Sequence, residues 1–230
     1  PTKSSAASDV YKRQQMLSPS GKSHTFDARA NGYARGEACG CAVLLPQLGD
    51  LQQVRCDACA VRQDGKSASL TAPNGTAQQA LIRAALESAG RAPGGGYVLE
   101  AHGTGTSLGD PIEARAICAT RDNPELMSVM GCKANVGHTE PTAGVSGLLQ
   151  LVTVVGQSVS CPNAHLRVLN PHVRAALQND CPSFAVQCPV IMPAAADLVG
   201  GVSSFGLNGT IAHVVVSTSG DNSSFGYRGT

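Results

Sequence analysis

One stretch limits the possible folds of this chain more than any other, because it joins a polar cluster to a long uncharged segment. Residues 131–140 read Gly-Cys-Lys-Ala-Asn-Val-Gly-His-Thr-Glu, and residues 141–157 carry no charge and mix small with apolar residues on every face. Such a segment is typical of a helix buried inside a folded layer. The acid and the proline at the junction suit the first turn of a helix. We therefore expect a buried helix, with Lys133 and His138 just outside its N-terminus.

Strand and helix signatures alternate along the rest of the chain. Apolar runs bounded by glycine, proline or polar residues predict strands at 41–45, 54–61, 97–99, 126–130, 199–203 and 211–216. An apolar stripe predicts a helix over 77–89 that Gly90 ends, and Asp110 is expected to cap a second helix that reaches about residue 120. This alternation predicts a mostly parallel α/β sheet with helices on both faces.

The charge pattern excludes two classes of partner. Charged residues make up only 14% of the chain, against about 25% in an average soluble protein. The net charge is +1, and no run of Lys or Arg is longer than two. Binding to nucleic acid or to an anionic membrane surface needs a basic patch, so we expect neither partner.

The chain also lacks a recognisable targeting or spanning segment. Every long apolar run is interrupted by polar residues, glycine or proline, and residues 1–23 have no apolar core of the kind that a secretory signal contains. We therefore expect a cytoplasmic protein, with a plastid as the alternative, and we expect its nine cysteines to be free thiols.

One folded domain is expected between two unstructured ends. Residues 1–15 show no periodicity and are expected to be a non-native or disordered leader. Residues 16–216 hold all the predicted strands and helices. Residues 217–230 are rich in Ser and Gly and are expected to form a disordered tail.

Polar clusters follow two successive predicted strands. His102 comes soon after the strand at 97–99, and the Lys133 to His138 pair follows the strand at 126–130. A lone histidine beside a buried helix is most simply a hydrogen-bonded core residue. However, the carboxyl ends of parallel strands meet at one edge of a sheet, and functional groups collect there. Two clusters at one edge therefore favour a functional site.

A dinucleotide site is disfavoured by the spacing of the glycines after the first cluster. Gly103, Gly105 and Gly109 are one residue too widely spaced for the dinucleotide-binding fingerprint. Thr104 and Thr106 are better interpreted as hydroxyl donors that line a polar tunnel.

Four cysteines close together in the sequence make a zinc site the other alternative. They are Cys39, Cys41, Cys56 and Cys59. Cys56 and Cys59 fall within one predicted strand, where an odd separation points side chains to opposite faces. A redox C-x-x-C motif normally begins a helix, which this one does not. We therefore expect no metal site, and a zinc-binding module remains the weakest of the functional alternatives.

Several motifs together resemble the β-ketoacyl synthase family, and the ketosynthase domains of type I polyketide synthases most of all. They are residues 100–106 (Glu-Ala-His-Gly-Thr-Gly-Thr), 109–113 (Gly-Asp-Pro-Ile-Glu), 133–138 (Lys-Ala-Asn-Val-Gly-His), 201–206 (Gly-Val-Ser-Ser-Phe-Gly), 31–37 and 70–75. The likeness covers roughly residues 16–216, with the motifs in the family's order.

The resemblance implies a fold, a reaction and partners. The fold would be α/β, with the layered αβαβα arrangement of the thiolases, represented here mainly by its C-terminal half. The reaction would be an acyl transfer, a decarboxylative Claisen condensation of an acyl thioester with a malonyl-type thioester. The substrates would be carried on the phosphopantetheine of an acyl carrier protein, with no cofactor bound directly, and the full-length protein would be a homodimer.

The resemblance also implies roles for individual residues. His102 and His138 would stabilise the extender carbonyl as negative charge develops, and Lys133 would orient the second histidine. Thr104 and Thr106 would contact pantetheine. The glycine-rich turn would supply an oxyanion-hole donor and a gate, at Leu207 and Phe205.

The family's nucleophile is a cysteine in an Ala-Cys-Ser-Ser type of context, and no cysteine of this chain stands in that context. We therefore expect the chain to be an inactive fragment of a ketosynthase. The alternative is a non-catalytic ketosynthase-like partner subunit or scaffold.

Overall fold

The computed structural model describes residues 16–46, 54–66, 72–91, 96–122, 126–177, 182–184, 190–191 and 198–218. The main helices are α2 (Gly75–Ser88), α3 (Gly109–Cys118), α4 (Lys133–Val136), the 3-10 helix η3 (Glu140–Thr142), α5 (Ala143–Gln157) and α6 (Pro171–Leu177). The strands are β1 (Val54–Gln63), β2 (Tyr97–Glu100), β3 (Met127–Met130), β4 (Val159–Ser160), β5 (Ser183–Phe184), β6 (Val190–Ile191), β7 (Val199–Phe205) and β8 (Thr210–Thr218).

Six of the strands form one mixed sheet, in the order β1-β8-β7-β2-β3-β5. The neighbours from β7 to β5 run parallel, as the sequence predicts for the strands that precede the polar clusters. β8 is antiparallel to β7, to which a tight turn joins it, and it is also antiparallel to β1. β4 and β6 form a separate two-stranded antiparallel sheet.

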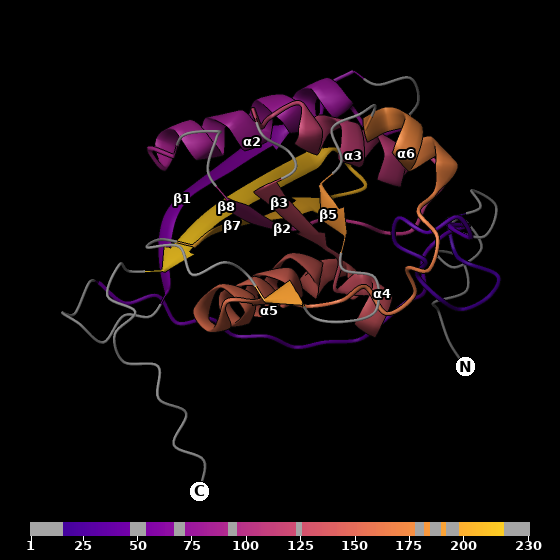
Figure 1. The fold of residues 1–230 in the computed structure, drawn as a ribbon, viewed down its shortest axis with the longest axis horizontal. Helices are drawn as coiled ribbons and strands as arrows, with labels where there is room; N and C mark the ends of the chain where they lie inside the picture. Colours follow the sequence, from indigo (N-terminus) through magenta and orange to yellow (C-terminus); the bar gives the residue numbers. More distant parts are fainter. Residues whose placement is uncertain are drawn as a thin grey trace, which may run out of the picture.

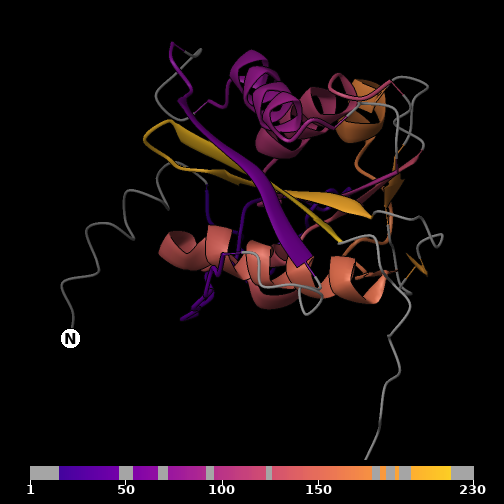
Figure 2. The ribbon, with the colours of Figure 1, turned by 90° about the vertical axis from the view of Figure 1, so that its left-hand side faces the viewer.

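Helices cover both faces of this sheet, which gives three layers (Figure 1). α2, α3 and α6 lie on one face and α5 lies on the other, an arrangement that Figure 2 shows from the side. The side chains of β2 alternate between the two interfaces. Tyr97 and Leu99 pack in the cluster beneath α2 and α3, whereas Val98 packs with Leu151 and Val155 of α5.

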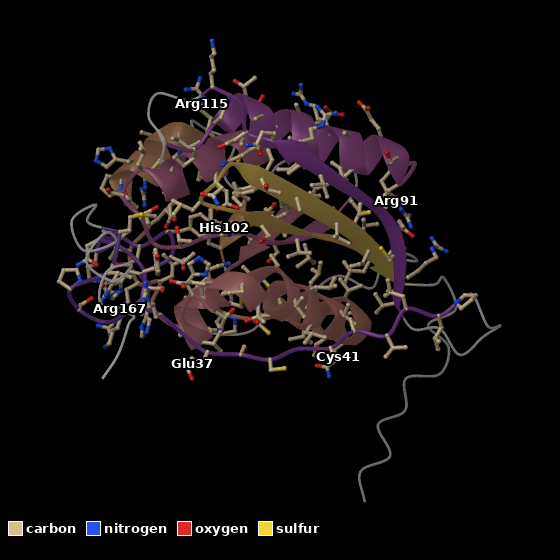
Figure 3. All side chains as sticks on the ribbon, turned by 180° about the vertical axis from the view of Figure 1, so that it is seen from behind. Glu37, Cys41, Arg91, His102, Arg115 and Arg167 are labelled. Carbon is tan, nitrogen blue, oxygen red and sulfur yellow. The ribbon has the colours of Figure 1, made fainter. Side chains whose placement is uncertain are left out.

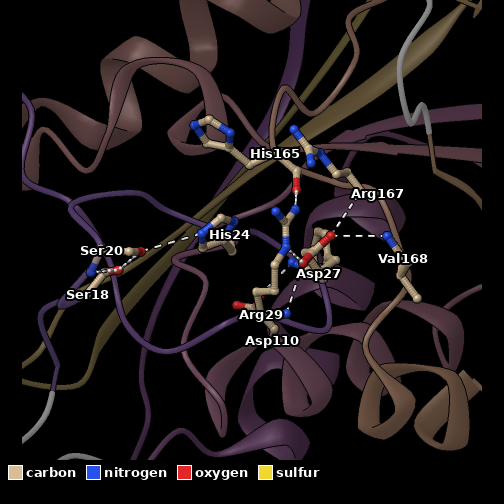
Figure 4. Close-up of polar contacts among 10 residues, drawn as sticks. Ser18, Ser20, His24, Asp27, Arg29, Asp110, His165, Arg167 and Val168 are labelled. Atoms are coloured by element: carbon tan, nitrogen blue, oxygen red, sulfur yellow. Dashed lines mark hydrogen bonds and ion pairs between the residues drawn. The ribbon is translucent and has the colours of Figure 1, made fainter.

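A buried carboxylate ties the first described segment to the chain after α5. Asp27 is fully buried and receives hydrogen bonds from the backbone N–H groups of Arg167 and Val168, at 2.7 and 3.1 Å (Figure 4). Arg29 forms an ion pair with the same carboxylate at 2.6 Å and donates to the carbonyl of His165. Burial alone would raise the pKa of Asp27, but these hydrogen bonds outweigh it and hold the pKa well below its usual range.

The strand that we expected at 41–45 is absent. These residues are extended but pair with none of the described strands, and Val43 and Leu44 are each 78% exposed. The segment runs along the outer side of α5, where Gly40 lies against Val145 and Leu149 (Figure 2). An apolar run forms a strand only where another strand can pair with it. Among the described residues no strand lies beside 41–45, and the sequence alone could not reveal this.

α5 is buried on one side rather than all round, so that part of the prediction was wrong. Its buried residues are Ala143, Gly147, Leu151, Val154 and Val155. Leu149, on the outer side, is 39% exposed. The junction is also more elaborate than expected, because η3 precedes α5 and Lys133 begins a short helix of its own, α4.

Two helix starts differ in detail from the prediction. α2 begins two positions early because the side chain of Asn74 accepts hydrogen bonds from the N–H groups of Thr76 and Ala77. Asp110 does not cap α3, because its carboxylate accepts instead from the N–H groups of Phe26 and Gly105, at 2.7 and 3.0 Å.

The expected domain ends fall mostly outside the described residues, since 1–15 and 219–230 are not among them. β8 continues to Thr218, so Ser217 and Thr218 belong to the sheet rather than to the expected tail. No helix of the described part is long and apolar enough to span a membrane.

Candidate active site

The polar clusters meet because β2 and β3 are adjacent and parallel, with Glu100 paired to Met130 at their ends. The loops that follow are held together by Thr25, whose hydroxyl donates to the carbonyl of Gly103 at 2.7 Å. Its methyl group lies where a Cβ on Gly103 or Gly131 would be, at 2.6 and 2.8 Å. Glycine is therefore required in both loops for this close approach.

His102 is oriented from two sides. Glu113 of α3 accepts hydrogen bonds from the backbone N–H groups of His102 and Gly103, at 2.7 and 2.8 Å. The Nδ1 atom of His102 accepts from the N–H of Phe205, at the end of β7, at 3.3 Å. Three elements, β2, α3 and β7, thus hold this ring inside the molecule (Figure 3).

His138 is held in the same way. Its Nδ1 atom accepts from the N–H of Glu140 at 3.2 Å. The rings of His102 and His138 meet edge to face, with their centroids 5.5 Å apart and their planes at 88°. The structure therefore brings together the two histidines that the sequence placed on successive strand ends.

These contacts fix the protonation of both rings. A backbone N–H can only donate, so each Nδ1 carries a lone pair and each neutral ring carries its proton on Nε2. Burial, followed by the nearby charge of Lys133, lowers the pKa of His138 to about 4. Burial also lowers the pKa of His102 well below its usual value, and Lys133 and His138 act in the same direction. At neutral pH the site therefore offers two Nε2–H donors.

Lys133 begins α4 and is almost completely buried, and its charge acts on both rings. Within the described part of the chain, no carboxylate forms an ion pair with it at 4.0 Å or less. Its charge nevertheless acts on Glu100, where burial raises the pKa to about 7 and Lys133 opposes that rise. Glu100 in turn accepts from the N–H of Cys132 at 2.7 Å and from Gln150 of α5 at 3.3 Å.

The threonines that we expected to contact substrate lie next to each other in the loop before α3. The hydroxyl oxygens of Thr104 and Thr106 are 3.3 Å apart. Thr106 also accepts from the N–H of Gly109 at 3.1 Å, so its hydroxyl supports the helix start that we had assigned to Asp110. Their contact with pantetheine stays a prediction.

The turn between β7 and β8 adjoins His102. The ring of Phe205 lies 5.3 Å from that of His102, centroid to centroid, and its N–H is used by the histidine. Leu207, at the tip of the turn, is 42% exposed. Gly209 has a φ of +85°, which lets the chain reverse there. The turn lies beside the site, and its role as donor and gate stays a prediction.

Sequence reasoning missed the roles of three glutamates that organise this site. Glu100 and Glu113 are buried and hold the loops, yet a glutamate in a sequence ordinarily indicates the surface. Glu140 was interpreted only as a helix-start acid, although its N–H holds His138. Their positions in the sequence could have indicated burial, because Glu100 ends a buried strand and Glu113 lies on the helix that follows.

The prediction about Cys56 and Cys59 was wrong. A β-bulge at Cys56 shifts the register, so that Cys56 pairs with Val216 and Cys59 with Val214. Since these valines are two positions apart, both cysteines point to the same face. Among the described residues, no group of three or more His, Cys, Asp or Glu side chains could hold a metal ion. Cys181 and Cys188 lie outside those residues.

Comparison with known sequences identifies two family models along the chain. The model of the β-ketoacyl synthase C-terminal domain matches residues 54–167, and the model of the N-terminal domain matches residues 3–48. The second match begins within the segment that we expected to be a leader, so the domain boundary at residue 16 stays a prediction.

The similar proteins are polyketide synthases. A phenolphthiocerol/phthiocerol polyketide synthase of Mycobacterium tuberculosis is 43% identical over 87% of this chain, which spans 11% of that protein. Highly reducing polyketide synthase 40 of Fusarium pseudograminearum is 38% identical over 88% of this chain, which spans 8% of that protein. The chain is therefore about a tenth of the length of these relatives.

The similar solved structures are ketosynthases. The ketosynthase from module 6 of the bacillaene synthase of Bacillus subtilis 168 superposes with a TM-score of 0.80 at 27% identity, covering 94% of this chain and 40% of that one. An oxazolomycin ketosynthase domain from Streptomyces albus gives 0.78 at 26% identity, covering 91% of this chain and 38% of that one. With its thiolase-like α/β fold and its two histidines at neighbouring strand ends, this chain belongs to the β-ketoacyl synthase family.

Proposed function

We propose that this chain is part of a ketosynthase domain that lengthens acyl thioesters by decarboxylative Claisen condensation during polyketide assembly. The observation that carries the proposal is the pair of neutral imidazoles, His102 and His138, whose Nδ1 atoms are each occupied by a backbone N–H. This arrangement leaves two Nε2–H donors for a substrate oxygen.

Such donors suit the first chemical step. When a malonyl thioester loses carbon dioxide, the bond between its α-carbon and its carboxylate breaks, and the electron pair forms an enolate with negative charge on the thioester oxygen. Preorganised donors aimed at a developing oxyanion contribute about 3 to 4 kcal/mol each in other enzymes. His102 and His138 can supply two of them from one edge of the sheet.

Lys133 adds to this effect without donating to the substrate. Its positive charge disfavours protonation of both rings, which keeps Nδ1 free to accept from the backbone. It also contributes a positive potential where the enolate charge develops, inside a buried site in which charges interact strongly. Lys133 thus acts through the histidines, as a positioning residue.

The second step needs an acylated cysteine. The enolate carbon forms a bond to the acyl carbonyl carbon, the bond from that carbon to sulfur breaks, and the cysteine leaves as a thiolate. No cysteine of this chain stands in the family's nucleophile context. The chain covers only 40% of the solved ketosynthase from Bacillus subtilis. The nucleophile therefore belongs, in this proposal, to a part of the domain outside the 230 residues, and the chain alone is inactive in condensation.

Carrier and assembly complete the proposal. The acyl and malonyl groups would arrive on the phosphopantetheine arm of an acyl carrier protein, and Thr104 and Thr106 in the loop before α3 would contact that arm. The turn at Phe205 and Leu207 would supply an oxyanion donor and a gate beside His102. The complete domain would be a homodimer.

A second candidate rests on the same cysteine observation. A ketosynthase-like protein without a nucleophile could still use His102 and His138 to decarboxylate a malonyl thioester, while transferring no acyl group. It would differ from a condensing enzyme in forming no covalent acyl intermediate.

The experiment uses the complete ketosynthase that contains this chain. It is incubated first with an acyl carrier thioester and then with a malonyl carrier thioester. Mass spectrometry follows the acyl-enzyme and the extended product, and the released carbon dioxide is measured as well. Acyl-enzyme followed by a β-keto product supports the condensing function. Carbon dioxide release without acyl-enzyme supports the second candidate. The absence of both carbon dioxide and acyl-enzyme refutes both candidate functions.

A further inference from the structure

Glu140 adopts a backbone conformation that L-residues rarely occupy. Its φ is +49°, and only Phe26 and Ser158 share a positive φ among the described residues other than glycine. Ser158 ends α5 in the left-handed cap that is common at helix ends, whereas Glu140 lies at the start of η3. Strain of this kind persists only where surrounding contacts hold it, and it is concentrated at functional sites.

The backbone N–H of Glu140 reaches the site. It donates to Nδ1 of His138, two positions earlier, at 3.2 Å, and the turn conformation of Thr139 (φ −81°, ψ 9°) directs it there. That hydrogen bond keeps the proton of the ring on Nε2, where it can serve a substrate oxygen.

The carboxylate of Glu140 is held from the opposite side by the first described segment. Arg35 forms an ion pair with its Oε1 atom at 3.1 Å, and the hydroxyl of Tyr33 donates to the same oxygen at 3.5 Å. The two charged side chains are more than a third exposed, 38% for Arg35 and 36% for Glu140. An exposed pair of this kind contributes little to stability, so its location matters more than its strength.

The same segment, residues 33–36, also forms hydrogen bonds with the backbone of His138. The N–H of His138 donates to the carbonyl of Ala34 at 2.7 Å, and its carbonyl accepts from Gly36 at 2.9 Å. The buried ring of Tyr33 meets the imidazole edge to face, with centroids 4.9 Å apart. Residues 33–36 therefore contact both the histidine and the acid that fixes its tautomer.

We propose that Glu140, anchored by Arg35 and Tyr33, is a positioning residue that fixes the ring of His138 with its proton on Nε2. The inference rests on the proposed function for its catalytic meaning, but the tautomer itself can be observed without any activity. In this view the contacts of the carboxylate with Arg35 and Tyr33 locate Glu140, and its backbone N–H then holds the imidazole.

The test is nuclear magnetic resonance of the ¹⁵N-labelled chain at pH 7, in which long-range ¹H–¹⁵N correlations report which ring nitrogen of His138 carries the proton. Glu140→Ala removes the carboxylate, and with it the contacts to Arg35 and Tyr33. Arg35→Gln removes the partner but leaves Glu140 in place. Glu37→Gln is the matched control, because Glu37 is an exposed acid in the same segment that points to solvent (Figure 3).

We expect the wild-type chain and Glu37→Gln to show the Nε2–H form alone, and both test variants to show a mixture with the Nδ1–H form. A His138 ring that keeps only the Nε2–H form in both Glu140→Ala and Arg35→Gln overturns the proposal. Arg35→Gln keeps the test valid if Glu140→Ala fails to fold, because it removes the same ion pair and leaves Glu140 unchanged.

A kinetic measurement on the complete ketosynthase separates this proposal from the proposed function. Arg35→Gln should lower kcat for malonyl decarboxylation about tenfold with KM unchanged, since small displacements of a catalytic group reduce rate rather than binding. Glu37→Gln should match the wild type. If the wild type itself does not decarboxylate, the proposed function fails while the tautomer result stands. If Arg35→Gln keeps the wild-type kcat, the positioning role fails.

Discussion

Nδ1 of His102 and Nδ1 of His138 both accept a backbone N–H, and the two rings meet edge to face with their centroids 5.5 Å apart. The donors come from different parts of the chain, Phe205 at the end of β7 and Glu140 at the start of η3. Backbone groups cannot change their protonation, so the tautomers are built into the fold. The site is therefore prepared to donate two hydrogen bonds before any substrate arrives.

Replacing Glu113 by Gln should destabilise the loop that carries His102. The carboxylate uses both oxygens to accept backbone N–H groups. The amide of Gln has only one oxygen, and its NH₂ group would face the second backbone N–H, so that two donors would meet. We expect a loss of about 1 to 3 kcal/mol in the free energy of unfolding, measured by urea denaturation. Glu87→Gln, at an exposed position on α2, is the control and should change little. Equal losses in the two variants would argue against this role for Glu113.

Gly201→Ala should disrupt a buried hydrogen bond behind the site. A Cβ at this position would overlap the hydroxyl of Tyr97 and Nε2 of His213, which lie 3.0 Å apart in the core. We expect overpacking to cost about 1 to 3 kcal/mol or more, measured as a lower midpoint of thermal or urea unfolding. Gly96→Ala is the matched control, because the nearest atom to its Cβ would be 3.9 Å away. A wild-type midpoint for Gly201→Ala would contradict the packing described.

His213 should make the folded chain sensitive to acid. Burial lowers the pKa of His213 to about 3, and its ring contacts the hydroxyl oxygens of Tyr97 and Ser203. An unfolded histidine has a pKa of about 6.5. Because the folded pKa is depressed, the unfolded state binds more protons between these values, and stability is lost as pH falls from 6.5 toward 3.

The measurement is the free energy of unfolding against pH for the wild type and for His213→Gln. We expect a shallower acid loss in the variant over that window, with part of the slope remaining because the pKa values of His102 and His138 are lowered as well. Parallel curves for the two proteins would show that His213 is not a buried neutral group.

Much of the fold could be predicted because periodicity reflects burial. β2 and β3 are buried on both faces, so their short apolar runs stand out, and the helix pattern of α2 follows from its one buried face. The run at 41–45 shows the limit, since an apolar pattern states a preference and not a partner. The bulge at Cys56 shows another limit. One extra residue in the strand reverses which face of the sheet each later side chain of β1 points to.

The site was predictable in part for a related reason. Strand ends collect functional groups, so His102, Lys133 and His138 could be expected to meet, and their motifs supplied roles. The acids that hold them could not be predicted so readily. A buried carboxylate such as Glu113 is stabilised by backbone N–H groups that only the folded chain brings near, and the left-handed backbone of Glu140 has no signature in a sequence.

The central claim is that two imidazole donors stabilise the enolate formed by decarboxylation. Its most direct test is the rate of carbon dioxide release from a malonyl carrier thioester by the complete ketosynthase, compared for the wild type, His102→Ala, His138→Ala and the exposed control His172→Ala. We expect each site variant to lose roughly 100-fold or more in rate, with acylation of the nucleophilic cysteine still measurable in His138→Ala and no loss in the control. Wild-type decarboxylation by either His102→Ala or His138→Ala would contradict the account.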